Sequence, residues 1–69
     1  MTREEIFAIL EAIRALGMAE QQFTFYAEEH RKKGSEEKAA TNYGYATLVG
    51  SAYEHLKLKF PDCVPTELA

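Results

Sequence analysis

The segment from His30 to Glu37, H-R-K-K-G-S-E-E, decides how this chain folds. Its three consecutive cations, Arg31 to Lys33, suit the negative end of a helix dipole, and Gly34 can adopt the left-handed conformation that closes a helix. Ser35 is a favourable N-cap, and two glutamates follow it where the first turn of a helix favours negative charge. One helix therefore ends and another begins at once, which predicts two antiparallel helices joined by a turn at 34–35.

The first helix is expected to start at a capping box, because Thr2 is followed three residues later by Glu5. Apolar residues then recur every three or four positions on one face as far as Ala27. Gly17 costs about 1 kcal/mol relative to alanine, which leaves a kink open. We expect one long helix over about residues 3–33. Its apolar face comprises Ile6, Ile9, Leu10, Ile13, Leu16, Phe23 and Ala27, with Glu20 as the one carboxylate.

The second helix is expected over about residues 36–60, because Pro61 ends it. The tail, residues 61–69, contains a second proline and is expected to be irregular. Tyr43 lies about 160° from Tyr45 on a helical wheel, so we expect the two rings to point in opposite directions. The predicted inward face is Tyr45, Val49, Leu56 and Phe60, and the predicted outward face is Tyr43 with Ala39, Ala46 and Gly50.

Residues 39–53 carry no charge, although 28% of the chain is Asp, Glu, Lys or Arg. Two explanations remain open. In the structural one, the small residues form a smooth stripe on which another helix packs, and the hydroxyls bond to carbonyls. In the functional one, aromatic faces and polar groups are presented to a binding partner by Asn42, Tyr43, Tyr45 and Tyr53. The stripe comprises Ala40, Gly44, Thr47 and Ser51.

A second apolar row on the first helix predicts self-association. Phe7, Met18 and Phe25 point roughly away from the main apolar face at 100° per residue. A chain of 69 residues is near the lower limit for independent folding, and oligomerisation is a common source of further burial. We therefore expect an all-α fold, a long antiparallel helical hairpin over residues 1–60, completed by oligomerisation into a helical bundle. The expected interface is Phe7, Met18, Phe25, Gly44 and Ser51.

The charge and the cysteine content limit the functions and the cellular compartments that are expected for this chain. The net charge of −3 argues against general nucleic-acid binding, which relies on a positive field. Cys63 is the only cysteine, which excludes an internal disulfide and fits a reducing compartment. No stretch approaches the roughly 20 apolar residues of a membrane span, and Glu11 and Arg14 interrupt the apolar run that a signal peptide would need. We expect a cytoplasmic protein that does not bind membranes.

The basic turn is the one candidate anion site. Arg31, Lys32 and Lys33 precede the free amides of the second helix, where a phosphate could bind. Against this, Glu28 and Glu29 are each placed to pair with a lysine four residues later, and the turn has no phosphate-loop glycine pattern.

No catalytic or metal-binding set is recognisable. His30 and His55 would lie roughly 25 Å apart in a hairpin, at 1.5 Å per residue, so one chain cannot bring them to one metal. We therefore predict a non-enzymatic oligomer without a cofactor that binds another protein as a regulator or inhibitor. The alternative is an oligomeric sponge or sensor for a small anionic ligand such as a nucleotide. The candidate binding residues are Asn42, Tyr43, Tyr53, Arg31, Lys32 and Lys33.

Overall fold

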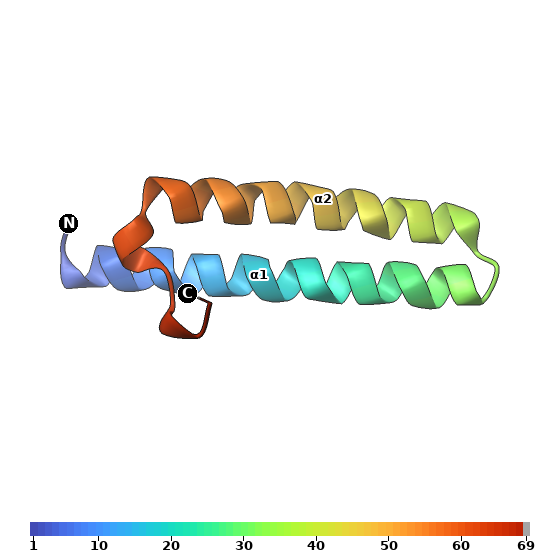
Figure 1. Ribbon diagram of the computed structural model, residues 1–69, viewed down its shortest axis with the longest axis horizontal. Helices are drawn as coiled ribbons and strands as arrows, with labels where there is room; N and C mark the ends of the chain where they lie inside the picture. Colours follow the sequence, from blue (N-terminus) through green and yellow to red (C-terminus); the bar gives the residue numbers. More distant parts are fainter. Residues whose placement is uncertain (69) are drawn as a thin grey trace.

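The computed structural model describes residues 1–68. It contains helix α1, Arg3–Lys32, helix α2, Glu36–Lys59, and two short 3-10 helices, η1, Pro61–Cys63, and η2, Thr66–Leu68. The two long helices pack antiparallel, with the N-terminal turns of α1 extending beyond the end of α2, which confirms the predicted all-α hairpin (Figure 1). The pair is elongated, 48 Å long and 18 Å across.

Both ends of α1 form as their sequence predicts. The Thr2 amide donates to Glu5 Oε1 at 2.8 Å, and the Glu5 amide donates to Thr2 Oγ1 at 3.1 Å, which completes the capping box. At the other end Gly34 has a φ of 80°, in the left-handed region that a side chain would strain. The Ser35 amide donates to the His30 carbonyl at 2.8 Å and closes the helix. Ser35 begins α2, but its side chain makes no capping hydrogen bond.

Two glycines let the helices approach closely at mid-length. A Cβ built on Gly17 would lie 3.0 Å from Tyr53 Cε2, so the aromatic ring of α2 lies against bare backbone of α1. On α2, Gly50 likewise has no room for a Cβ, because the side chain of Glu20 from α1 lies against it. Each helix therefore supplies one glycine and one large side chain, three residues apart. Helix α1 continues through Gly17 without a break.

The inward face of α2 differs from the one predicted. Ala39, Ala46 and Gly50 are buried, and Tyr43 on the same side is half-buried, whereas Tyr45 is 48% exposed. The prediction followed the large side chains, but the close contact with α1 selects the small ones. Tyr45 instead packs beside Phe23, with ring centroids 5.3 Å apart.

The fully buried part of the core is correspondingly small. Its members are Ile13, Ala27, Ala39, Ala46 and Cys63, and Pro65 is buried with them.

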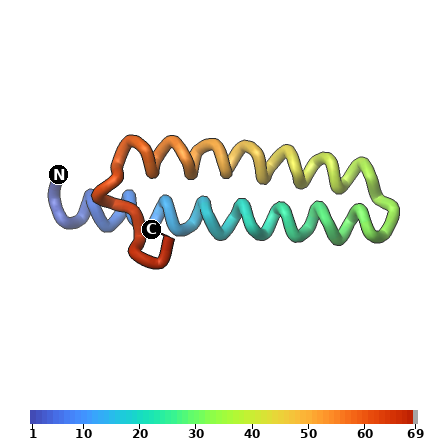
Figure 2. Tube along the Cα trace, in the orientation of Figure 1, coloured from blue at the N-terminus to red at the C-terminus, as the bar shows by residue number. Residues whose placement is uncertain are grey.

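The segment expected to be irregular folds back onto the hairpin. After η1 the chain crosses α1, so that the tail lies against the first half of that helix (Figure 2). Helix η1 contacts both long helices, and both Cys63 and Pro65 are completely buried. The tail is therefore part of the core.

Gly44 and Gly50 should respond in opposite ways to substitution. We expect Gly44→Ala to stabilise the fold by about 0.5–1 kcal/mol, because a Cβ there meets no atom within 4 Å and alanine favours the helix. Gly50→Leu should destabilise it by about 1–3 kcal/mol, because Glu20 occupies the space. Thermal unfolding followed by circular dichroism measures both, and equal destabilisation would contradict this account of helix packing.

Candidate functional site

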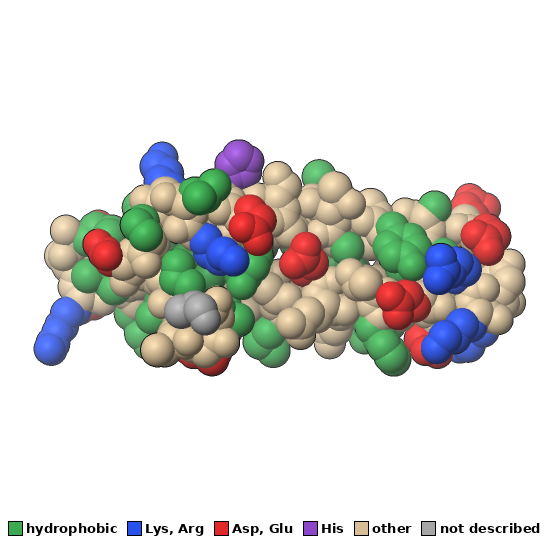
Figure 3. All heavy atoms as spheres, in the orientation of Figure 1, with side chains coloured by type: hydrophobic (Ala, Val, Ile, Leu, Met, Phe, Trp, Pro, Cys, Tyr) green, Lys and Arg blue, Asp and Glu red, His purple; other side chains and the backbone are tan. Residues whose placement is uncertain are grey.

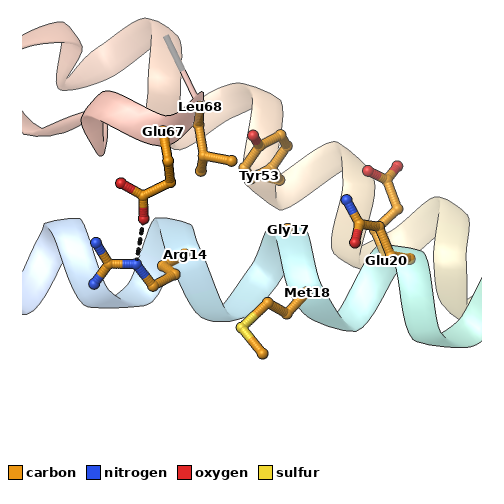
Figure 4. Close-up of a pocket in the computed structure, with 8 residues that line it drawn as sticks. Arg14, Gly17, Met18, Glu20, Tyr53, Glu67 and Leu68 are labelled. Atoms are coloured by element: carbon orange, nitrogen blue, oxygen red, sulfur yellow. Dashed lines mark hydrogen bonds and ion pairs between the residues drawn. The ribbon is translucent and has the colours of Figure 1, made fainter.

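A hollow in the surface lies where the tail meets α1. It is an open hollow of about 300 Å³. Glu67 and Leu68 of the tail form one wall, α1 forms the floor, and Tyr53 of α2 closes the far side (Figure 4). The remaining lining residues are Arg14, Gly17, Met18, Glu20 and Gln21.

Arg14 ties the tail to the floor of this hollow. Its Nε donates to Glu67 Oε1 at 2.7 Å, and its Nη1 pairs with Glu11 on the preceding turn of α1. These bonds raise the pKa of Arg14, first through Glu67 and then through Glu11, and they lower the pKa of Glu67. Because two carboxylates already occupy the guanidinium, Arg14 is a structural clasp and is poorly placed to bind an anion.

Tyr53 is the central side chain of the hollow. One part of its ring rests on Gly17, and Lys57 Nζ lies 4.4 Å from the ring centroid, in a cation–π arrangement. Leu68 points toward the ring from the tail (Figure 4). Glu20 lies beyond Tyr53 along α1, and among residues 1–68 no cation forms an ion pair with it. The hollow thus combines an aromatic and aliphatic wall with one unpaired carboxylate.

A row of exposed apolar side chains runs along α1 beside the hollow. Phe7, Met18 and Phe25, which we call the outer row, are 64%, 64% and 57% exposed, as expected for side chains that face away from α2. In Figure 4 Met18 points away from the tail and from Tyr53. Figure 3 shows apolar side chains along this edge of the molecule, where they interrupt the charged groups.

The other predicted site residues lie apart from one another. Asn42 and Tyr43 are half-buried on α2, and the Asn42 amide donates to the Lys38 carbonyl at 2.9 Å. Gly44 and Ser51 are exposed on the outward side of α2. The hydroxyls of Thr41 and Thr47 also bond to carbonyls four residues back, so this uncharged stretch satisfies much of its polarity within its own helix.

The basic turn is remote from the hollow. Arg31, Lys32 and Lys33 are exposed at the tip of the hairpin, and Lys32 Nζ lies 3.5 Å from Glu29 Oε1. Since Arg31 follows Gly17 by 14 residues on one helix, the turn lies roughly 20 Å from Tyr53. A single chain therefore does not bring the predicted phosphate-binding and stacking groups together.

Sequence reasoning missed the tail as part of this site. Glu67 comes 53 residues after Arg14, its partner on α1, and no local spacing connects the tail with that helix. The available signal was chemical: Val64 lies between Pro61 and Pro65 and Leu68 follows them, and apolar residues beside prolines are typical of a strap that packs on a core.

Comparison with protein-family models, with curated proteins and with solved structures found no match for this chain. No helix within residues 1–68 is long and apolar enough to cross a membrane. In the same part of the chain, no three His, Cys, Asp or Glu side chains are grouped so that they could hold a metal ion.

The tail should detach as Glu67 is protonated. The pKa of Glu67 is lowered in the folded chain, so its contribution is present above the unfolded pKa and is lost as pH falls through the folded pKa. The buried Cys63 thiol reports on this. At pH 7 we expect Glu67→Gln to react several-fold faster than wild type with a thiol reagent.

The ratio of the two rates removes the intrinsic pH dependence of thiol chemistry. It should approach one as pH falls through the folded pKa of Glu67, where the wild-type carboxylate also becomes neutral. A ratio of one already at pH 7 would show that the Arg14–Glu67 bond does not hold the tail.

Proposed function

We propose that this chain is a small non-enzymatic, oligomeric helical module that binds another protein, as a regulator or an inhibitor. The observation that carries the proposal is the outer row of α1, three large apolar side chains that are each more than half exposed on an otherwise charged helix. Large apolar side chains that stay exposed on one side of a helix of a small acidic protein are typical of a protein-binding surface.

The spacing of the outer row suits a helical or grooved partner. Met18 follows Phe7 by three turns and Phe25 follows Met18 by two, so the row runs nearly parallel to the helix axis. Residues repeated on one side of a helix are the usual anchors when a helix docks in an apolar groove. Aromatic side chains also carry much of the binding energy at such surfaces.

The hollow adds a second contact beside this row. Its wall of Tyr53 and Leu68 suits the aliphatic stem of a partner side chain, and the unpaired carboxylate of Glu20 suits a positive or hydrogen-donating end. We therefore expect the partner to present apolar residues to α1 and a lysine or arginine to the hollow.

Capture of a nucleotide-like anion is the weaker alternative. It would need the turn of one chain to lie near the tyrosines of another, because Arg31, Lys32 and Lys33 lie far from Tyr53 within one chain. The guanidinium of Arg14 is already paired with two carboxylates, so it is not a free cation for an anion to bind. The lowered pKa of Glu67 also keeps its carboxylate negatively charged beside the hollow.

Native mass spectrometry of the protein isolated from its host identifies a bound partner and any retained ligand together. Met18→Glu combined with Phe25→Glu should then weaken the partner at least about tenfold, because two charges would enter an apolar contact. Ala40→Glu combined with Thr47→Glu is the control, since it adds the same charge to exposed positions of α2. Undiminished binding by the outer-row variant would disprove the proposal.

The same measurement separates the alternative. Changing Arg31, Lys32 and Lys33 together to glutamine should leave partner binding nearly intact, because exposed charges usually contribute less than about 1 kcal/mol each. A retained nucleotide in wild type that the triple variant loses, with a helical circular dichroism spectrum preserved, would favour anion capture instead.

A further inference from the structure

We propose that a second copy of this chain packs on the side of the hairpin opposite the tail, and that the two copies form a four-helix bundle. The inference specifies the oligomeric part of the proposed function and rests on it. It requires nothing of the partner protein or of the outer row.

The tail defines one side of the hairpin. It bonds to Arg14 through Glu67, and the hollow beneath it is lined by Gly17 and Gln21. These three residues of α1 lie within about 60° of one another at 100° per residue, so they mark a single side of that helix. That side is covered in part by the tail and carries ion pairs.

The contact between Phe23 and Tyr45 marks the opposite side. The two rings meet across the helix pair, with centroids 5.3 Å apart. On the wheel, Phe23 lies about 120° or more from Gly17, Gln21 and Arg14, and Ala12, Ala15 and Ala19 lie on its side of α1. On α2, Leu48 and Ala52 lie next to Tyr45. We call the surface formed by Ala12, Ala15, Ala19, Tyr45, Leu48 and Ala52 the two-helix face.

The two-helix face is apolar across its width. Leu48 is 70% exposed, and the alanines at 12, 15 and 52 are exposed beside it. Between the two rows, Leu16, Phe23, Val49 and Leu56 are only half-buried, so their outer parts form an apolar floor. None of the six residues of the two-helix face is charged, and neither is any of the four residues of this floor. A face built on both helices of a hairpin is the surface that helical bundles bury.

The exposed area of the chain exceeds that of a compact monomer by about the area that a dimer interface would cover. The structure exposes 5154 Å², whereas a compact monomer of its 7.8 kDa would expose roughly 4,400 Å². The radius of gyration, 14.3 Å, likewise exceeds the roughly 11 Å of a compact 69-residue domain. The excess area is close to the roughly 800 Å² that each partner buries in a standard interface.

Charge selects a second copy as the occupant. The chain has a net charge of −3, so two copies repel one another over most orientations. The two-helix face is where that repulsion is weakest, because its residues are neutral. An uncharged surface offers no complementary charge pattern to a different protein, and it is the part of this chain on which two copies meet with the least repulsion.

The shapes of the two rows also complement each other. One row consists of alanines on α1, and the other includes Tyr45 and Leu48 on α2. A two-fold axis along the hairpin places α2 of each copy over α1 of the other at the same height, so Ala52 and Leu48 of one copy come near Ala19 of its partner. Because Glu20 faces Gly50 within the hairpin, Leu48 and Ala19 are separated by only about one helical turn along the hairpin axis.

This assignment revises the interface expected from the sequence. A row on one helix, such as Phe7, Met18 and Phe25, offers a narrow contact, whereas the two-helix face combines side chains of both helices. The outer row remains free for the partner protein when two copies meet on the two-helix face.

Ala52→Glu tests the interface, with Ala40→Glu as the matched control on the same helix. Both alanines are exposed in the hairpin, but only Ala52 belongs to the two-helix face. Sedimentation equilibrium should show two chains for wild type and for Ala40→Glu at tens of micromolar. Ala52→Glu should raise the dimer dissociation constant by about 100-fold, because each interface would bury an unpaired charge. A monomeric wild type, an unaffected Ala52→Glu or a dissociated Ala40→Glu would each overturn the inference.

A thiol-protection experiment keeps the inference testable if Ala52→Glu fails to fold. Ala52→Cys and Ala40→Cys are small changes, and the native Cys63 is buried in both. We expect a maleimide to react at least about tenfold more slowly with Cys at 52 than with Cys at 40 in the dimer, since burial blocks access. The difference should vanish on dilution to monomer. Equal rates at high concentration would overturn the inference.

Failure of this inference and failure of the proposed function give different results. If the outer-row variant loses the partner but wild type is monomeric, protein binding stands and the dimer falls. If wild type dimerises through the two-helix face but the outer-row variant binds its partner normally, the dimer stands and the outer row has been assigned the wrong role.

Discussion

The reciprocal contact of two glycines with two large side chains sets the geometry of the whole hairpin. Tyr53 rests on Gly17 and Glu20 rests on Gly50, so at this helix spacing neither glycine position has free space for a side chain. This contact fixes which side of α2 faces inward, and it thereby decides that Ala39 and Ala46 are buried. The exposed surfaces, including the outer row and the two-helix face, follow from it.

The ends of the helices could be predicted because each depends on a few neighbouring residues. Thr2 with Glu5 begins α1, and Gly34 separates the two helices as expected. The inward side of α2 could not be predicted by following its largest apolar residues, since that helix has apolar groups all round and the short interhelical distance favours small ones. The docking of the tail was equally inaccessible, because it depends on a bond between Arg14 and Glu67, far apart in the sequence.

The uncharged stretch from 39 to 53 acquires two roles in the structure. Its inward half packs on α1, as the structural explanation held, and its threonines and Asn42 bond to carbonyls of their own helix. Its outward half leaves Tyr45 and Leu48 exposed without a charge near them. The absence of charge thus serves the hairpin on one side, and on the other it leaves a surface suited to a second chain.

The tight turn at Gly34 has a consequence for how the chain reaches its native state. Residues next to the turn are close in sequence, so pairing them loses little loop entropy, and each further turn of helix pairs at a small added cost. We expect the two helices to pair progressively from the turn towards the other end of the hairpin, with the rapid kinetics typical of local contacts. Arg14 and Glu67 close a loop of 53 residues, far longer than the loops near the turn, so the tail should dock last. An early folding species would therefore be a helical pair that still exposes its thiol.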